Sequence, residues 1–470
     1  MSETTFSSLK RGVLGVGTFC AVLSLWGAPP RIDREDIRLE ADGNRAVITY
    51  TLSDAPAIVT VDIQTNTAAN AAGEWVSVGG ENIQTFSSDS AVNRIVRGDG
   101  EKRIVWRARK DLPDRTFPNG IRAEVKAWAL NNPPTWLVAG LDRDNDVRFY
   151  ADKSFLPQGF SSQLYKQTHL LMRRIPAAGV VWRMGLSEQE GQFSAEYDHS
   201  HNVMLTKDYY IGVYPITQGH YTNVTKAANI ALMRLGNFDL TKTTSAYVSN
   251  LTTTANWPMN SISLRQLRGQ SGDFTNTADS NIYYSKDGHK VGKDCWIDKL
   301  RKQTGLDDFD LPTEAQWEFA CRAGTDTAYY NGSMTDAHYS EIGWWSQNSD
   351  GYTTVPDRAK ATPLHEVGCL LGNAFDLYDM CGNVKEVCVE RMLVGEDYVN
   401  SLAPGWEKGV ETIDPDGGTA TVGNASRVVK KGGDVAEKRD CAKSGARDVG
   451  GWSYTDYWTG ARLWHPAEFK

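Results

Sequence analysis

Cys441 is the first residue of this chain whose type and surroundings could support chemistry. It lies in the segment RVVKKGGDVAEKRDCAKSGARD, residues 427–448, which combines two glycines with many charged side chains. A cysteine thiolate is a nucleophile and a metal ligand, and nearby cations such as Lys438, Arg439 and Lys443 would lower the thiol pKa. A nucleophile also needs a base, and no histidine lies near Cys441 in the sequence. The alternatives are a disulfide partner and a free, partly buried thiol.

The other cysteines do not form a recognisable metal motif. Beyond the N-terminal segment the chain holds Cys295, Cys321, Cys369, Cys381, Cys388 and Cys441. An even number permits disulfides in an exported protein, although the number alone cannot pair them. No two cysteines have CxxC spacing, and there are only 8 histidines, which argues against a zinc-finger-like site.

Composition restricts the classes of partner. The 470 residues carry a formal net charge of −8, which argues against a general nucleic-acid binder, because such proteins present a basic surface. The length suits two or three domains. No segment of the mature chain is long and apolar enough for an integral membrane span.

The N-terminus has the pattern of an export signal. Lys10 and Arg11 precede the largely apolar run GVLGVGTFCAVLSLWG, so residues 1–28 are predicted to be a signal segment. We therefore expect an exported protein, periplasmic, at the cell surface or secreted. Trp26 stands where a cleavage site prefers a small residue, and a buried N-terminal helix is the alternative.

Residues 30–135 are predicted to form a small all-β sandwich. Segments 46–52, 57–65, 103–109 and 122–130 are rich in Val, Ile, Thr and aromatic residues, and polar turns separate them. The segment NNPPTW marks a boundary, so residues 136–165 are predicted to be a linker before a second domain over 166–470.

The second domain shows short strands, many Gly and Trp residues, and few helices. One helix is well marked in LPTEAQWEFACRAGT, residues 311–325. Thr313 is a good N-cap, Gln316 completes a capping box, and Gly324 is placed to end the helix. A second helix is predicted over 294–305, which also ends on glycine.

Five segments of this domain, in order, resemble the formylglycine-generating enzyme (sulfatase-modifying factor) family. They are VVWRMG, DYYIGVYPITQGHY, LPTEAQWEFACRAGT, NAFDLYDMCGNVKEVC, and the C-terminal RVVKKGGD and GARL. The resemblance implies an α+β, C-type-lectin-like fold of low regular secondary structure. It also implies an oxidase that uses molecular oxygen and two copper(I)-binding cysteines to convert a cysteine of a sulfatase segment to formylglycine.

The copper-binding cysteine pair of the family is not intact in this chain. In the family, the pair follows Gly-Gly-Ser. Here Asp434 replaces the serine, Glu437 stands at the first cysteine position, and Ala442 stands at the second, beside Cys441. Copper(I) selects thiolates over hard carboxylates, so we expect neither a bound copper ion nor a catalytic cysteine pair. The resemblance instead implies a Cys321–Cys441 disulfide that joins the capped helix to this loop.

The resemblance also implies a structural calcium site. Its ligands would be Asp379, Gly382, Val384 and Glu386, through carboxylates and backbone carbonyls. The alternative is a tight turn in which the two carboxylates only bind backbone amides. Lys385 and Val387 replace two tryptophans of the family motif in GNVKEV, which should change the local packing.

The C-terminal segments supply candidate binding residues. Arg447 and Arg462 match recurring arginines of the family, and structural ion pairs are the alternative to ligand binding. The loop GGWSYTDYW is rich in Trp and Tyr. These side chains are favoured binding anchors when they are exposed, and a packed loop is the alternative. The candidate binding residues are Asp434, Glu437, Arg447, Trp452, Tyr454, Tyr457, Trp458 and Arg462. We expect a binding or scaffold protein for a peptide or glycan, with a diverged formylglycine-generating oxidase as the alternative.

Overall fold

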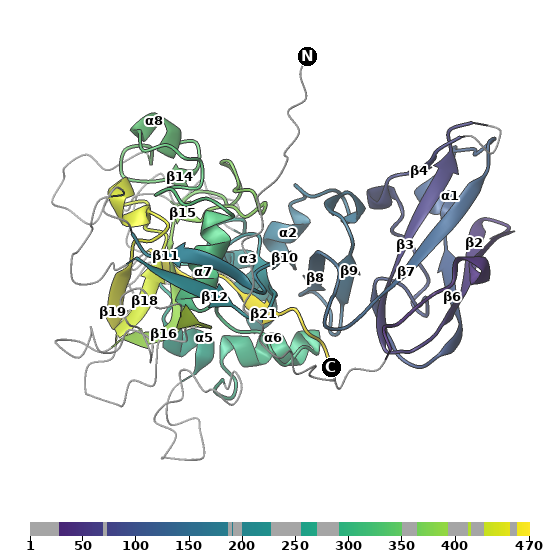
Figure 1. Ribbon diagram of the computed structural model, residues 1–470, viewed down its shortest axis with the longest axis horizontal. Helices are drawn as coiled ribbons and strands as arrows, with labels where there is room; N and C mark the ends of the chain where they lie inside the picture. Colours follow the sequence, from purple (N-terminus) through teal and green to yellow (C-terminus); the bar gives the residue numbers. More distant parts are fainter. Residues whose placement is uncertain are drawn as a thin grey trace, which may run out of the picture.

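The computed structural model describes most of the chain (Figure 1). The described residues are 28–68, 73–186, 190, 200–226, 255–269, 291–349, 364–392, 412–414, 427–451 and 458–470. Residues 1–27 of the predicted signal segment lie outside these ranges. Within them, none of the helices has the length and apolar character needed to cross a membrane.

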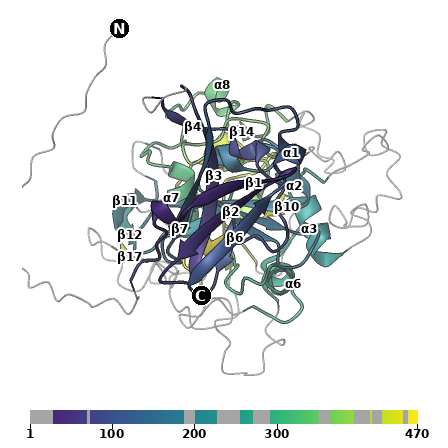
Figure 2. The same cartoon turned by 90° about the vertical axis from the view of Figure 1, so that its right-hand side faces the viewer.

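The N-terminal part consists of two small sheets that share one core. One sheet has the order β1-β2-β6, and the other has β3 at its centre, paired with β4, β5 and β7. The strands are β1 (Arg38–Asp42), β2 (Arg45–Leu52), β3 (Ala57–Asn66), β4 (Trp75–Ser77), β5 (Arg94–Val96), β6 (Gly100–Trp106) and β7 (Ile121–Trp128). Figure 2 looks onto this part, with β1, β2 and β6 in front of β3 and β7.

Strict alternation in the sequence explains this sandwich. Along β2, every second residue is buried, because successive side chains of a strand point to opposite faces. Ile48 and Ile104 of one sheet and Val59 of the other are fully buried in the shared core. Strands lie at all four segments where the sequence predicted them.

A five-stranded antiparallel sheet organises the C-terminal part. Its order is β21-β13-β10-β8-β9. The strands are β8 (Trp136–Gly140), β9 (Val147–Tyr150), β10 (His169–Ile175), β13 (Tyr209–Gly212) and β21 (Trp464–Pro466). Residues 136–165 were expected to be a linker, but they contribute β8 and β9 to this sheet. β8 is buried at every position, so its apolar run belongs to the core.

Three smaller sheets complete the described strands of this part. Their orders are β11-β12-β17, β14-β15 and β19-β18-β16-β20. The strands are β11 (Val180–Met184), β12 (His201–Leu205), β14 (Gly343–Trp344), β15 (Cys381–Gly382), β16 (Lys385–Met392), β17 (Thr412–Ile413), β18 (Arg427–Lys431), β19 (Asp448–Gly451) and β20 (Thr459–Gly460). The mixture of short sheets and few helices confirms the predicted α+β class.

The helices are short, and local capping explains their boundaries. In α7 (Glu314–Arg322) the predicted capping box is present, with Thr313 and Gln316 bonded reciprocally. The helix α6 (Trp296–Thr304) ends at Gly305, whose φ of 71° lies in the left-handed region. The remaining helices and 3-10 turns are α1 (Ala108–Asp111), α2 (Leu164–Gln167), α3 (Gln218–Thr225), α5 (Leu264–Arg268), α8 (Asp336–Tyr339), η1 (Arg34–Asp36), η2 (Gly80–Asn82), η3 (Lys153–Phe155) and η7 (Arg439–Ala442).

Candidate functional site

Two glycines bring the loop after β18 against its neighbours. Gly432 and Gly433 have φ values of 91° and 65°, which side chains rarely adopt. A Cβ on Gly433 would lie 2.8 Å from that of Ala442, so glycine is needed for this close approach. The carbonyl of Gly432 accepts a hydrogen bond from the Gly382 N–H at 2.6 Å. The loop therefore starts in contact with the segment that leads into β16.

Lys385 lies at the centre of this site, at the start of β16. Its Nζ is 2.6 Å from a Glu437 oxygen, 2.9 Å from Asp448 and 3.3 Å from Asp434. Lys385 is only 8% exposed and Asp434 only 3%. Three carboxylates thus surround one cation, and one of them, Glu437, stands where the sequence resemblance expects the first cysteine.

The crowding of carboxylates changes their protonation. Burial, and then the neighbouring charge of Glu437, raise the pKa of Asp434 to about 7. Burial disfavours the ammonium form of Lys385, but the charges of Asp434, Glu437 and Asp448 outweigh it and raise the Lys385 pKa above its usual value. Lys385 therefore stays charged at neutral pH, whereas Asp434 gains or loses its proton near neutral pH.

Cys441 is not an activated thiol in this structure. Burial, and then the negative charge of Glu437, raise the pKa of Cys441 to about 12. Two of the three cations expected to lower that pKa are engaged elsewhere, with Arg439 paired to Asp336 at 2.6 Å and Lys443 to Asp440 at 3.2 Å. The thiol form is therefore dominant at neutral pH, which argues against the nucleophile hypothesis.

The predicted Cys321–Cys441 bridge is not formed. All six described cysteines are free thiols. Cys321 is fully buried on α7, and its Sγ lies 3.5 Å from the Oγ of Ser444. The C-terminal loop thus presents Ser444, three residues beyond Cys441, to the cysteine of the capped helix.

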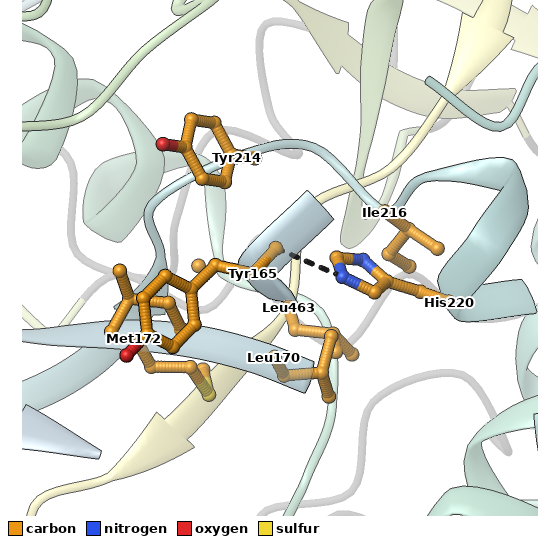
Figure 3. Close-up of a pocket in the computed structure, with 9 residues that line it drawn as sticks. Tyr165, Leu170, Met172, Tyr214, Ile216, His220 and Leu463 are labelled. Atoms are coloured by element: carbon orange, nitrogen blue, oxygen red, sulfur yellow. Dashed lines mark hydrogen bonds between the residues drawn. The ribbon is translucent and has the colours of Figure 1, made fainter. Parts of the chain in front are cut away.

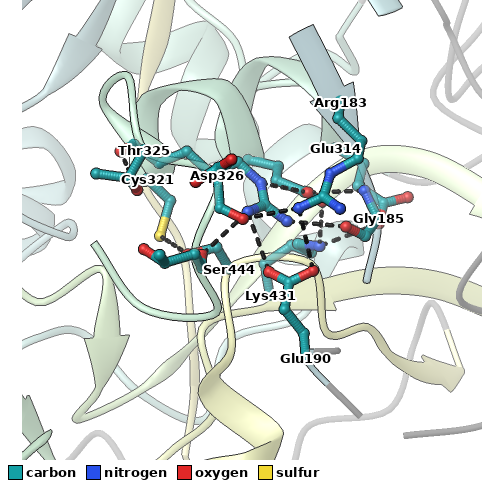
Figure 4. A network of polar contacts seen from close by, with 12 residues as sticks. Arg183, Gly185, Glu190, Glu314, Cys321, Thr325, Asp326, Lys431 and Ser444 are labelled. Carbon is teal, nitrogen blue, oxygen red and sulfur yellow. Dashed lines mark hydrogen bonds and ion pairs between the residues drawn. The ribbon is translucent and has the colours of Figure 1, made fainter. Parts of the chain in front are cut away.

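A buried ion network that includes Lys431, the residue before the two glycines, lies beside this cysteine (Figure 4). Lys431 Nζ lies 3.0 Å from Glu318 and 3.3 Å from Glu314. Arg322 pairs with Glu318 at 2.9 Å, and Arg447 pairs with Glu314 at 2.7 Å. Arg447, a predicted binding residue, is therefore part of a structural ion-pair network, which was the alternative considered from the sequence.

Arg462 likewise has a structural role, and it occupies the carboxylate of the predicted calcium site. It is fully buried and bonds both oxygens of Glu386, at 2.7 and 2.9 Å, while Trp317 Nε1 donates to Glu386 at 2.5 Å. Asp379 accepts from the Gly368 N–H at 2.7 Å and from Asn383 at 3.1 Å. With a guanidinium bound to both of its oxygens, Glu386 is engaged in an ion pair and is not free to ligate calcium in this arrangement.

One other group of metal-type side chains occurs among the described residues, at Asp142, Asp146 and His169. Asp146 already pairs with Arg143 at 3.2 Å and with Arg148 at 3.1 Å. The two arginines largely balance the charge of the two aspartates, so this acidic turn does not need a bound cation.

Of the predicted aromatic loop, only Trp458 is described, since Trp452, Tyr454 and Tyr457 lie outside the described residues. Trp458 is half-buried and packs against the cluster of Leu364, Val384 and Val435. Its carbonyl accepts a hydrogen bond from the Lys385 N–H at 2.8 Å. Trp458 therefore supports the backbone that carries Lys385.

A small cavity beside α3, shown in Figure 3, has no room for a ligand. Its volume is about 10 Å³, room for roughly one water molecule. His220 lies beside it, with Nε2 3.1 Å from the carbonyls of Tyr165 and His169 and with Nδ1 accepting from the Thr217 N–H. Burial lowers the pKa of His220 to about 4, so this histidine is a neutral structural residue of the α3 cap.

Lys385 is the site residue that reasoning from the sequence missed. The sequence showed only that a lysine replaces a tryptophan of the family motif. A lysine at a normally apolar position and new acidic residues at 434 and 437 together indicate that the lysine pairs with the acids. Reading those departures as one set would have placed the three side chains together.

The comparisons with known proteins agree with the motif pattern. The family model "Sulfatase-modifying factor enzyme 1-like domain" matches residues 173–465, more than half of the chain. None of the curated proteins matches.

Solved structures that resemble the chain include Treponema denticola variable protein 1, PvdO from Pseudomonas aeruginosa and CarF. They share 20%, 19% and 14% identity, with TM-scores of 0.42, 0.43 and 0.34. The alignments cover 64%, 63% and 63% of this chain and 96%, 94% and 98% of the others. The family assignment rests on the family model and its five motifs, and by that criterion the chain belongs to the sulfatase-modifying factor family.

Proposed function

We propose that this protein is an exported binding or scaffold member of the family that has lost copper oxidase chemistry. The observation that carries the proposal is the 2.6 Å ion pair between Lys385 and Glu437, which is at the first cysteine position. A carboxylate held by an ammonium group is a poor donor for copper(I), which selects thiolates. The raised pKa of Cys441 leaves the remaining sulfur protonated.

The proposed ligand is a peptide or a glycan that contacts the C-terminal aromatic loop beside Trp458. Three features support a role in binding. The Lys431 network and the Arg462–Glu386 pair are buried, so the described residues of this domain form a well-packed scaffold. The charged side chains Glu437 and Asp448 at the site remain partly exposed. Aromatic side chains on such a scaffold make effective anchors.

An aldehyde assay tests the loss of oxidase activity. Purified protein is incubated with copper(I), oxygen and a CxPxR peptide of sulfatase type, and the peptide mass is measured for conversion of its cysteine to formylglycine. We expect no conversion above that in a protein-free control. Conversion that disappears in Cys441→Ser would overturn the proposal and support the diverged oxidase instead.

The proposed export is tested separately by the N-terminus of the mature protein. Expression in a bacterial host, followed by fractionation and intact-mass measurement, should find the chain outside the cytoplasm without its first ~28 residues, the length of the predicted signal. Replacing Lys10 and Arg11 by Glu should reduce export. A full-length chain retained in the cytoplasm would contradict this part of the proposal.

A further inference from the structure

A cavity lies away from the family site, where the β-sandwich meets the five-stranded sheet. Its volume is about 280 Å³. The outer face of β3 and β7 forms one wall, and Tyr150 and Ala151 at the end of β9, with Phe155 of η3, form the other. In Figure 1 this is the junction between β3 and β7 on one side and β9 on the other. Small-molecule sites favour such domain junctions, at volumes from roughly 300 Å³ upward.

Two polar side chains that line this cavity make no hydrogen bond within the described part of the chain. Asn93 is 9% exposed and Tyr150 is 6% exposed, and both line the cavity. Among the described residues, neither the Asn93 side-chain amide nor the Tyr150 hydroxyl makes a hydrogen bond. Neither group is among the side-chain atoms that the fold seals off from solvent without a partner, so both are open to water or to a ligand.

Two carboxylates face each other on the wall of this cavity. Asp62 and Glu124 are directly opposite across β3 and β7. Gln64 Nε2 donates to both of them, at 2.9 and 2.8 Å. Like charges directly opposite each other destabilise a sheet, so this arrangement costs stability. It provides closely spaced acceptors at the cavity rim.

Apolar rings complete the lining. Phe86, Phe155 and Trp128 contribute aromatic surface. The ammonium of Lys126 already lies 3.7 Å from the centre of the Trp128 ring, which disfavours a second cation there. Asp62 and Glu124 disfavour an anion. A neutral ligand with an apolar face and edges that both donate and accept hydrogen bonds matches this lining.

We propose that this cavity binds a neutral saccharide of one or two rings, free or at the end of a glycan. A sugar ring offers C–H faces to the aromatic side chains and hydroxyls to Asn93, Tyr150 and the carboxylates. This site is separate from the proposed loop site, and it goes beyond the proposed function. Its failure would leave the oxidase result unaffected.

Ligand-observed NMR on the full chain tests the proposal with maltose, cellobiose and chitobiose as probes. The same sugars coupled to a carrier protein distinguish a free saccharide from a glycan terminus. We expect saturable binding of at least one probe. Tyr150→Phe and Glu124→Gln should each weaken it by about tenfold, the effect of losing one hydrogen bond.

Glu101→Gln provides the matched control. Glu101 is an exposed carboxylate on β6, in the other sheet of the sandwich, and its substitution should leave the affinity unchanged. Circular dichroism confirms that each variant is folded. The proposal is overturned if no probe binds, or if binding survives both cavity substitutions. Saturable binding of a lysine-rich peptide in place of all the sugars would also overturn it.

Discussion

Lys385 and Glu437, 52 positions apart in the chain, form a 2.6 Å ion pair beside the two glycines of the C-terminal motif. The two replacements are physically linked. A buried lysine requires carboxylates, and a carboxylate in the place of a thiolate requires a cation. Under the proposed function, this pair is structural and electrostatic and takes no part in metal binding.

Removing the cation should destabilise the fold. In Lys385→Met the mostly buried carboxylates of Asp434 and Glu437 lose their partner, so the free energy of unfolding should fall by about 3 kcal/mol. Urea unfolding measures this change. As a control, Lys302→Met removes an exposed lysine that pairs with Asp298, and it should change stability by less than ~1 kcal/mol. A Lys385→Met effect as small as that of the control would contradict the central role of Lys385.

The raised pKa of Asp434 predicts a specific dependence of stability on pH. The folded chain holds the proton up to pH of about 7, whereas an unfolded Asp releases it near pH ~4. Folding therefore binds a proton in this window, and the stability contribution is lost as pH rises from about 4 through about 7.

Asp434→Asn should remove this contribution. Between pH 5 and pH 8 the wild-type free energy of unfolding should fall by ~2 kcal/mol more than that of the variant. Urea unfolding at the two pH values provides the comparison, with Asp440→Asn as a control at an exposed carboxylate. Equal pH dependence in wild type and Asp434→Asn would rule out this assignment.

Cys441 should react slowly with alkylating reagents. With a pKa of about 12, its thiolate fraction at pH 8 is far below that of a cysteine in an unstructured peptide, whose pKa is about 8.5. Peptide mapping after iodoacetamide treatment should show labelling at least ~100-fold slower than in such a peptide. The exposed Cys369 should react first.

The cause of the slow reaction can be tested in the same experiment. Glu437→Gln removes the negative charge that raises the Cys441 pKa, so alkylation of Cys441 should become faster. If Cys441 already reacts as fast as Cys369 in the wild type, the thiol is activated and the nucleophile hypothesis returns.

The position of Ser444 predicts which loop residue can be bridged to α7. In Ser444→Cys, a disulfide to Cys321 should form under oxidising conditions, because the two side-chain atoms are 3.5 Å apart. The bridge would close a loop of about 120 residues and stabilise the fold by ~3 kcal/mol. Mass mapping without reduction should find this bridge in the variant and no Cys321–Cys441 bridge in the wild type. A Cys321–Cys441 peptide in the wild type would restore the original prediction.

The Glu386–Arg462 pair predicts a weak response to calcium. Because Arg462 holds both oxygens of Glu386, adding calcium or EGTA should leave the melting temperature of the wild type unchanged within ~1 °C. Glu386→Gln should lower the free energy of unfolding by about 3 kcal/mol with or without calcium. A rise of several degrees with calcium that is absent in Asp379→Asn would instead establish the calcium site.

The sequence by itself determined the features that depend on neighbouring residues. The alternation in residues 45–52 specified a strand with one buried face, and Thr313 with Gln316 specified the start of α7. These signals are local, because a strand's period and a helix cap involve only a few adjacent residues. The five ordered motifs also identified the family, since their pattern requires no knowledge of contacts.

Only the tertiary structure decided which distant groups meet. Lys385 gathers Asp434, Glu437 and Asp448 from a separate segment of the chain, and Ser444 rather than Cys441 faces Cys321. Residues 136–140 lack strict alternation because β8 is buried on both faces. The strand could therefore be recognised only from its pairing with β10 in the structure. Such contacts depend on the relative placement of elements far apart in the chain. Ser444 and Cys441 are only three residues apart in one loop, yet Ser444 is the one that contacts Cys321.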